Sequence, residues 1–144
     1  MRYLRLGVLA VIVITLLSCS ANSSKPAPQV NAYSRLQSIP PADPAKFGSV
    51  RDYKSWRNPY LTVQKDGVGL LDVKNNEQHL IKLEELPDAL ARLSPSAWPY
   101  GRVVAVTEDK GSSPGDDVLI RKNRGIVAGT LESLQILINW VPSS

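Results

Sequence analysis

The apolar residues from position 60 onward first follow the period of β-strands. Residues 60–73 hold two runs of β-branched and other apolar side chains on either side of Asp66-Gly67. This arrangement is typical of a β-hairpin with a tight turn. We expect Asp66 and Gly67 to occupy the two positive-φ positions of a type I′ turn, which places Val63 opposite Leu70.

The pattern then changes to the period of a helix. Residues 79–82 predict a short third strand. The leucines that follow are spaced three, four and three residues apart, which puts them on one helical face; they are Leu83, Leu86, Leu90 and Leu93. Pro87 fits this helix only in its first turn, where its missing N–H needs no partner.

Residues 102–107 are mainly apolar and lie between turn-forming segments, which indicates a buried central strand. A second helix is expected after them, with Asp116 or Asp117 as its N-cap. Its apolar stripe is Ile120, Val127, Leu131 and Leu134, and Gly125 and Gly129 weaken its regularity. Residues 135–141 predict a last strand. The sequence therefore predicts an α+β two-layer sandwich in the order hairpin, short strand, helix, strand, helix, strand.

Residues 20–57 show no such period and contain five of the 11 prolines, namely Pro26, Pro28, Pro40, Pro41 and Pro44. Proline fixes φ and removes a backbone donor, so we expect this part to be extended and solvated, neither helix nor strand. As a flexible coil it spans roughly 35 Å, and about 120 Å when fully extended. Residues 33–36 and 47–56 are the exception, because their aromatic and apolar spacing indicates either short helical turns docked on the domain or a sticky linker.

The N-terminus has the features of a secretory signal. Arg2 and Arg5 precede residues 6–17, which carry no charge, and this run is shorter than the ~20 residues that span a bilayer. It ends in Leu-Leu-Ser-Cys at residues 16–19, which resembles the lipobox of bacterial lipoproteins. The resemblance implies cleavage before Cys19 and acylation of its thiol, with Ser20 favouring the outer membrane in a Gram-negative cell. The alternatives are an ordinary secreted protein and a transmembrane anchor.

These observations divide the chain into a lipoprotein signal peptide (1–18), a lipid-anchored tether (19–57) and a small α+β domain (58–144). The formal charge is +4, and it falls to +2 once Arg2 and Arg5 are removed. A charge this small, without a clustered basic face, argues against nucleic acid as a partner. Cys19 is the single cysteine, so no internal disulfide is expected.

Candidate catalytic chemistry is sparse. Every Ser/His/Asp or Cys/His arrangement would need the one histidine, His79, which we expect at the surface or at a sheet edge. Asp116 and Asp117 are adjacent acids at a helix start, which indicates caps more than a cation site. With Asp109 they are the acids that an envelope hydrolase would use. We predict no catalytic residue, cofactor or metal.

Large aromatic side chains flank several predicted elements, at Trp56, Tyr60, Trp98, Tyr100 and Trp140. When half exposed, such rings bind sugars or partner proteins. In a small domain the usual role of tryptophan is to fill the core, and this is our expectation here.

Three segments resemble the periplasmic domain of the ExbD/TolR family of biopolymer-transport proteins: residues 61–67, residues 81–86 with Leu90, and residues 103–110. The resemblance implies a small α+β domain that dimerises and contacts peptidoglycan or partner proteins beside an inner-membrane motor. The family also has an N-terminal transmembrane helix with a functional aspartate, whereas residues 6–17 contain no acid. Proton-driven motor activity is therefore not expected.

The sequence thus predicts a non-catalytic lipoprotein of the cell envelope. Acylated Cys19 holds it to a membrane facing the periplasm, and its domain binds peptidoglycan or an envelope protein, with a homodimer as a further partner. The alternatives are a structural lipoprotein acting as a spacer and an envelope hydrolase.

Overall fold

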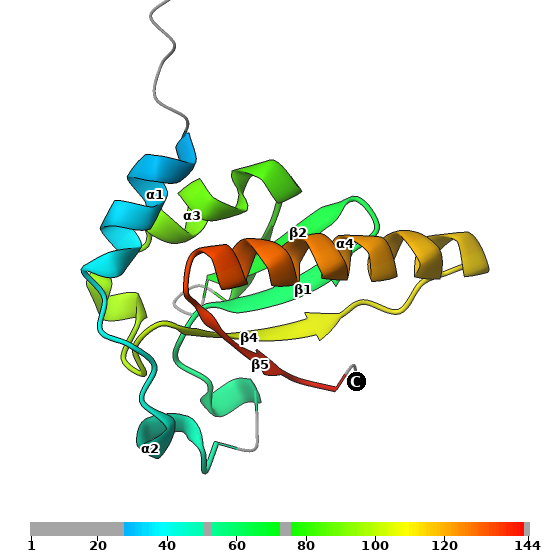
Figure 1. Cartoon of the computed structure of the whole chain (residues 1–144). Coiled ribbons are helices and arrows are strands. Elements are labelled where there is room, and N and C mark those ends of the chain that lie inside the picture. The colour runs from blue at the N-terminus through cyan, green and yellow to red at the C-terminus, as the bar shows by residue number, and fades with distance from the viewer. Residues whose placement is uncertain (1–27, 51–52, 73–75, 143–144) are drawn as a thin grey trace, which may run out of the picture.

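A five-stranded mixed sheet runs through the centre of the computed structural model, which describes residues 28–50, 53–72 and 76–142 (Figure 1). Its strand order is β3-β2-β1-β4-β5. β1 pairs antiparallel with β2, β2 antiparallel with β3, and β1, β4 and β5 are parallel to one another. The strands are β1 (Tyr60–Gln64), β2 (Gly67–Asp72), β3 (Glu77–Ile81), β4 (Val103–Glu108) and β5 (Leu137–Trp140).

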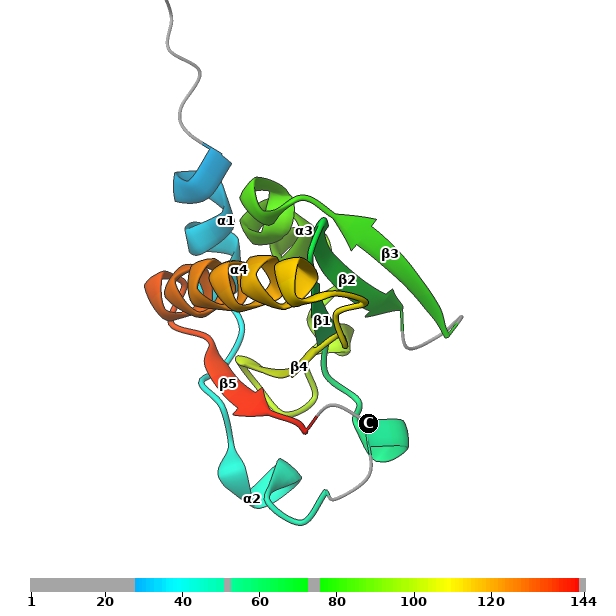
Figure 2. The same ribbon diagram turned by 90° about the vertical axis from the view of Figure 1, so that its right-hand side faces the viewer.

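Three helices cover one face of this sheet, and short helical segments lie on the other (Figure 2). The covering helices are α1 (Pro28–Gln37), α3 (Leu86–Arg92) and α4 (Pro114–Ser133), while α2 (Pro44–Phe47) lies beyond the opposite face. Three 3₁₀ turns complete the elements: η1 (Tyr53–Ser55), η2 (Leu83–Glu85) and η3 (Pro95–Ala97). The fold is a small α+β two-layer sandwich, as predicted, and its strands and helices follow the predicted order.

The hairpin is present, but its predicted register is wrong. Val63 lies opposite Val68 rather than Leu70, and Gln64 pairs with Gly67. The two turn residues are Lys65 and Asp66, both with negative φ, so the turn is not type I′. The turn moves by one residue and the pairing between the two strands therefore shifts by two, so Val63 keeps its place on the core face.

The first predicted helix is confirmed as η2 followed directly by α3. Leu86 and Leu90 are fully buried, and Leu83 and Leu93 pack against the same core. Pro87 lies in the first turn of α3, where a missing N–H costs nothing. The leucine spacing alone therefore located this helix and its buried face.

The second helix, α4, begins earlier than predicted. Its N-cap is Ser113, whose Oγ accepts from the amide of Asp116 at 3.2 Å. Asp116 and Asp117 therefore lie in the first turn, and neither is the N-cap. Pro114 occupies a first-turn position beside Ser113. A serine followed by proline is a strong helix start, and α4 therefore begins three or four residues earlier than predicted.

α4 then continues without a break to Ser133. Gly125 and Gly129 lie on its exposed side, where a Cβ would meet nothing within 4 Å. The two glycines therefore lower helix propensity without ending the helix.

The expectation that residues 20–57 are extended and solvated is wrong where α1 lies, and the docked-turn interpretation of residues 33–36 is confirmed. Residues 28–37 form α1, which packs beside α3 (Figure 1). Ala32, Leu36 and Ile39 are buried, and Leu36 and Ile39 belong to the main core. The folded unit therefore includes residues that the sequence had assigned to a tether, because these apolar side chains complete the helical layer.

A second, smaller cluster lies on the opposite face of the sheet. Trp56 is buried against Val103 and Ala105, and Phe47 and Tyr100 pack around it. The ring centroids of Phe47 and Trp56 are 5.9 Å apart, and those of Trp56 and Tyr100 are 5.2 Å apart, both edge-to-face. Of the two interpretations of residues 47–56, docking is the one confirmed for Phe47 and Trp56.

The predicted signal peptide and Cys19 lie outside the described residues, as do residues 20–27. Among the residues that the structure describes, no helix combines the length and the apolar character that crossing a membrane requires.

Candidate binding surface

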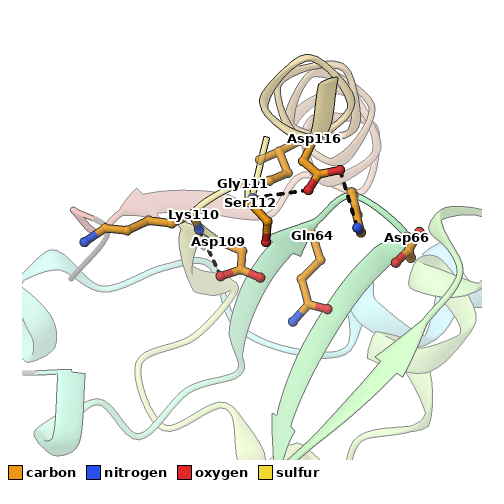
Figure 3. Close-up of a pocket in the computed structure, with 9 residues that line it drawn as sticks. Gln64, Asp66, Asp109, Lys110, Gly111, Ser112 and Asp116 are labelled. Atoms are coloured by element: carbon orange, nitrogen blue, oxygen red, sulfur yellow. Dashed lines mark hydrogen bonds and ion pairs between the residues drawn. The ribbon is translucent and has the colours of Figure 1, made fainter. Parts of the chain in front are cut away.

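A polar depression of about 100 Å³ lies at the carboxyl ends of β1 and β4, beside the first turn of α4 (Figure 3). It is lined by the hairpin turn, by the segment that joins β4 to α4, and by Asp116 and Ile120 of α4. Ligands often bind at such strand ends in open α/β sheets. Binding at this depression would require polar groups that are not already bonded within the chain.

Asp116 is occupied by contacts within the chain. One of its carboxylate oxygens lies 3.4 Å from Lys65 Nζ, and the other accepts from the amide of Ser112 at 3.2 Å (Figure 3). Two turns further along α4, the side-chain amide of Asn123 donates to the carbonyls of Gln64 and Lys65 at 2.8 and 2.9 Å. These bonds fasten the hairpin turn to α4, and they explain why the turn falls on Lys65 and Asp66.

Of the three acids proposed for a hydrolase, the structure brings Asp109 and Asp116 to the depression but does not aim them at one another (Figure 3). Asp109 accepts from the amide of Lys110 at 2.9 Å. Asp117 is exposed, with a carboxylate oxygen beside Gly111. Asp109 and Asp116 therefore serve the local structure.

His79 is exposed on β3, the edge strand farthest from β4 and β5, as the sequence predicted for an edge histidine. In the described part of the chain, no three His, Cys, Asp or Glu side chains come close enough to hold a metal ion.

Exposed apolar side chains gather on α4, and we call Val118, Leu119 and Ile126 the α4 patch. Their exposed fractions are 62%, 45% and 43%. At 100° per residue they lie around Lys122, away from the buried stripe of Ile120, Val127 and Leu131. Arg121 and Lys122 are exposed too, so the patch is apolar with basic neighbours. The sequence signal for it was the set of apolar α4 residues outside the predicted core stripe, which the prediction did not use.

A second exposed group lies at β5. Trp140 and Leu137 are 40% and 48% exposed. The guanidinium of Arg124 lies 4.4 Å from the centre of the Trp140 ring and 3.0 Å from a carboxylate oxygen of Glu108. This stacking holds the indole in a defined position while its outer face stays open to solvent.

The predicted aromatic residues divide between core and surface. Trp56 and Trp98 are buried, which confirms the core role expected for them, and Tyr60 and Tyr100 are half-buried. Trp140 alone among these five is exposed. The position of Trp140 follows from strand order, which the sequence pattern did not reveal.

Comparison with protein-family models, with curated proteins and with solved structures finds no match.

Proposed function

We propose that this protein is a cell-envelope lipoprotein, held to a membrane by acylated Cys19, whose α+β domain binds a partner protein without catalysis. The observation that carries the binding role is the α4 patch, where three large apolar side chains remain exposed on a well-formed helix. Apolar patches with polar rims mark protein-binding surfaces more often than sugar-binding ones.

The charge around the α4 patch indicates the chemistry of the partner. Arg121 and Lys122 adjoin the apolar side chains and are exposed, whereas the acids of α4 lie at its two ends, in the first turn and at Glu132. A partner surface with an apolar centre and an acidic rim is complementary to this arrangement. Peptidoglycan, which the ExbD/TolR resemblance also implies, has no such apolar centre.

The proposed anchor rests on residues 16–19. Each buried CH₂ of an acyl chain contributes ~0.8 kcal/mol, and two or more chains hold a protein stably at a membrane. Cys19→Ala should abolish the mass increase from acylation and move the protein out of the membrane fraction. Unchanged mass and fractionation would rule out lipidation at this residue.

The binding role is tested by photocrosslinking in cells from a residue placed at Val118, with the same probe at Leu80 as a control. Leu80 is equally apolar and 56% exposed, but it lies on β3. We expect an envelope protein to be captured from position 118 alone and to be lost in a Leu119→Ser/Ile126→Ser variant. Equal capture from both positions, or capture of peptidoglycan fragments, would contradict the proposal.

A spacer role is not tested cleanly by shortening the segment that follows Cys19. Shortening residues 24–46 would reduce the reach of a spacer, but this segment also includes the buried side chains of Ala32, Leu36 and Ile39. Any such deletion removes part of the core. Loss of function after such a deletion would therefore have two explanations, unfolding of the domain and a shorter reach from the membrane.

A further inference from the structure

The outer edge of β5 has backbone N–H and C=O groups that, among the described residues, face no neighbouring strand. Among the described residues, β5 has a neighbouring strand on one side only. The amides of Leu137 and Val141 donate to the carbonyls of Arg102 and Val106 on the β4 side, at 2.9 and 2.8 Å. Because backbone groups alternate in direction along a strand, the N–H and C=O groups of Ile138 and Trp140 point outward.

The two edges of the sheet differ in how they are protected. At the other edge, β3 carries exposed Glu77, Gln78 and His79, and polar or charged residues at an edge discourage pairing with other chains. β5 has no charged residue and exposes Leu137 and Trp140. An edge strand of this composition favours addition of another strand.

We propose that two copies of this chain pair through β5, antiparallel, about a two-fold axis at Asn139. In this register Ile138 of one copy lies opposite Trp140 of the other, and vice versa. Each of these pairs exchanges two backbone hydrogen bonds, so all four outward N–H groups are used. The five-stranded sheet of each copy then continues into the other.

The side chains of β5 are complementary to themselves in this register. On the helical face Ile138 meets Trp140, and on the opposite face Leu137 meets Val141, so apolar residues oppose apolar residues throughout. An axis at Ile138 fits less well, because it opposes Leu137 to Asn139. It also pairs Trp140 with Ile136, whose amide already donates to the carbonyl of Leu131 at 2.9 Å.

Two neighbouring features favour this contact. Pro142 directly follows Val141 and has no N–H, which limits pairing to the four residues of β5 and their immediate neighbour. Arg124 already holds the Trp140 ring at 4.4 Å, so little side-chain freedom is lost when a second copy covers it. This dimer contact lies on the side of α4 opposite the α4 patch, and it does not depend on the proposed function.

A disulfide across the axis tests the register. In the proposed pair the two Asn139 Cα atoms are about 4.5 Å apart, as in a non-hydrogen-bonded antiparallel pair, within the range that a disulfide bridges. We expect Asn139→Cys in the mature full-length protein to form a covalent dimer with itself under mild oxidation. Leu80→Cys, an exposed position on the other edge strand, is the matched control and should remain monomeric. Absence of the dimer in the first variant, equal dimer in both, or a mixed disulfide with another protein would overturn the proposal.

Sedimentation tests the contact without oxidation. Trp140→Lys removes the ring that opposes Ile138 and brings like charges beside Arg124. We expect it to weaken dimerisation at least tenfold, which corresponds to about 1.4 kcal/mol, with unchanged thermal unfolding. Leu119→Ser/Ile126→Ser, which alters only the α4 patch, should dimerise as wild type does. A wild-type protein that sediments as a monomer throughout the soluble concentration range would refute the inference and leave the proposed function untouched.

Discussion

Leu36 provides the sharpest test of whether α1 belongs to the fold. Its side chain is 0% exposed and lies in the same core cluster as Leu86, Leu90 and Trp98. Replacing a fully buried leucine with alanine costs about 2–5 kcal/mol through lost transfer energy and the cavity left behind. Because α1 packs mainly against a single helix, α3, we expect Leu36→Ala to fall in the lower half of that range, about 2–3.5 kcal/mol.

The assay is urea unfolding of the mature protein, followed by tryptophan fluorescence, since buried Trp98 reports the core that Leu36 completes. With a urea dependence of about 1–3 kcal/mol per M for a small protein, the midpoint should fall by roughly 0.7–3.5 M. Arg35→Ala is the matched control, because Arg35 neighbours Leu36 on α1 but is exposed, and it should change stability by less than about 0.5 kcal/mol. Equal, small effects of both substitutions would show that α1 is not part of the cooperative core and that the tether interpretation was correct.

Three further substitutions test individual features. Asn123→Ala removes two hydrogen bonds to the hairpin turn, should cost about 1–3 kcal/mol, and should speed amide exchange at the turn; unchanged exchange would contradict this role. Gly67→Ala should destabilise by more than about 1 kcal/mol, as measured by thermal unfolding, because Gly67 has φ +154° and an added Cβ would collide with the Ile81 carbonyl. Gly125→Ala should instead stabilise by roughly 0.5–1 kcal/mol in the same measurement, since its position is open; a loss of stability would indicate that something covers this side of α4.

The order of elements was predictable because it depends on local patterns. The leucines of η2 and α3 and the apolar run of β4 each specify their element without help from the rest of the chain. The hairpin register was not predictable in this way, because Asn123, distant in sequence, bonds the carbonyls at Gln64 and Lys65. When a tertiary contact sets the position of a turn, the residues of the turn do not specify that position by themselves.

α1 was predicted only in part: residues 33–36 were interpreted as docked helical turns or a sticky linker, and the full helix was not expected. Its buried residues Ala32 and Leu36, with Ile39 just beyond its end, are spaced four and three apart, which is a helical period. The prolines around them outweighed this signal, although Pro28 is the first residue of α1 and Pro40 comes after its end. Proline at a helix start or beyond its end is compatible with a helix between them.

The candidate binding surface was predictable only in part. Trp140 was named as a binding candidate, but its exposure depends on β5 being an edge strand, which requires the whole strand order. The α4 patch was not named, because the predicted helix was interpreted through its buried stripe. Val118 and Ile126 are apolar residues outside that stripe, but their exposure depends on which elements pack against α4, and this requires the whole fold.

The docking of α1 also changes where the domain can act. Residues 20–27 are all that separate Cys19 from the first residue of α1. At about 3.3–3.6 Å per residue this stretch reaches roughly 30 Å at most, which is comparable to the hydrocarbon thickness of one bilayer. A protein acylated at Cys19 is therefore confined to the layer next to its own membrane, and the partner must come to that membrane to be bound.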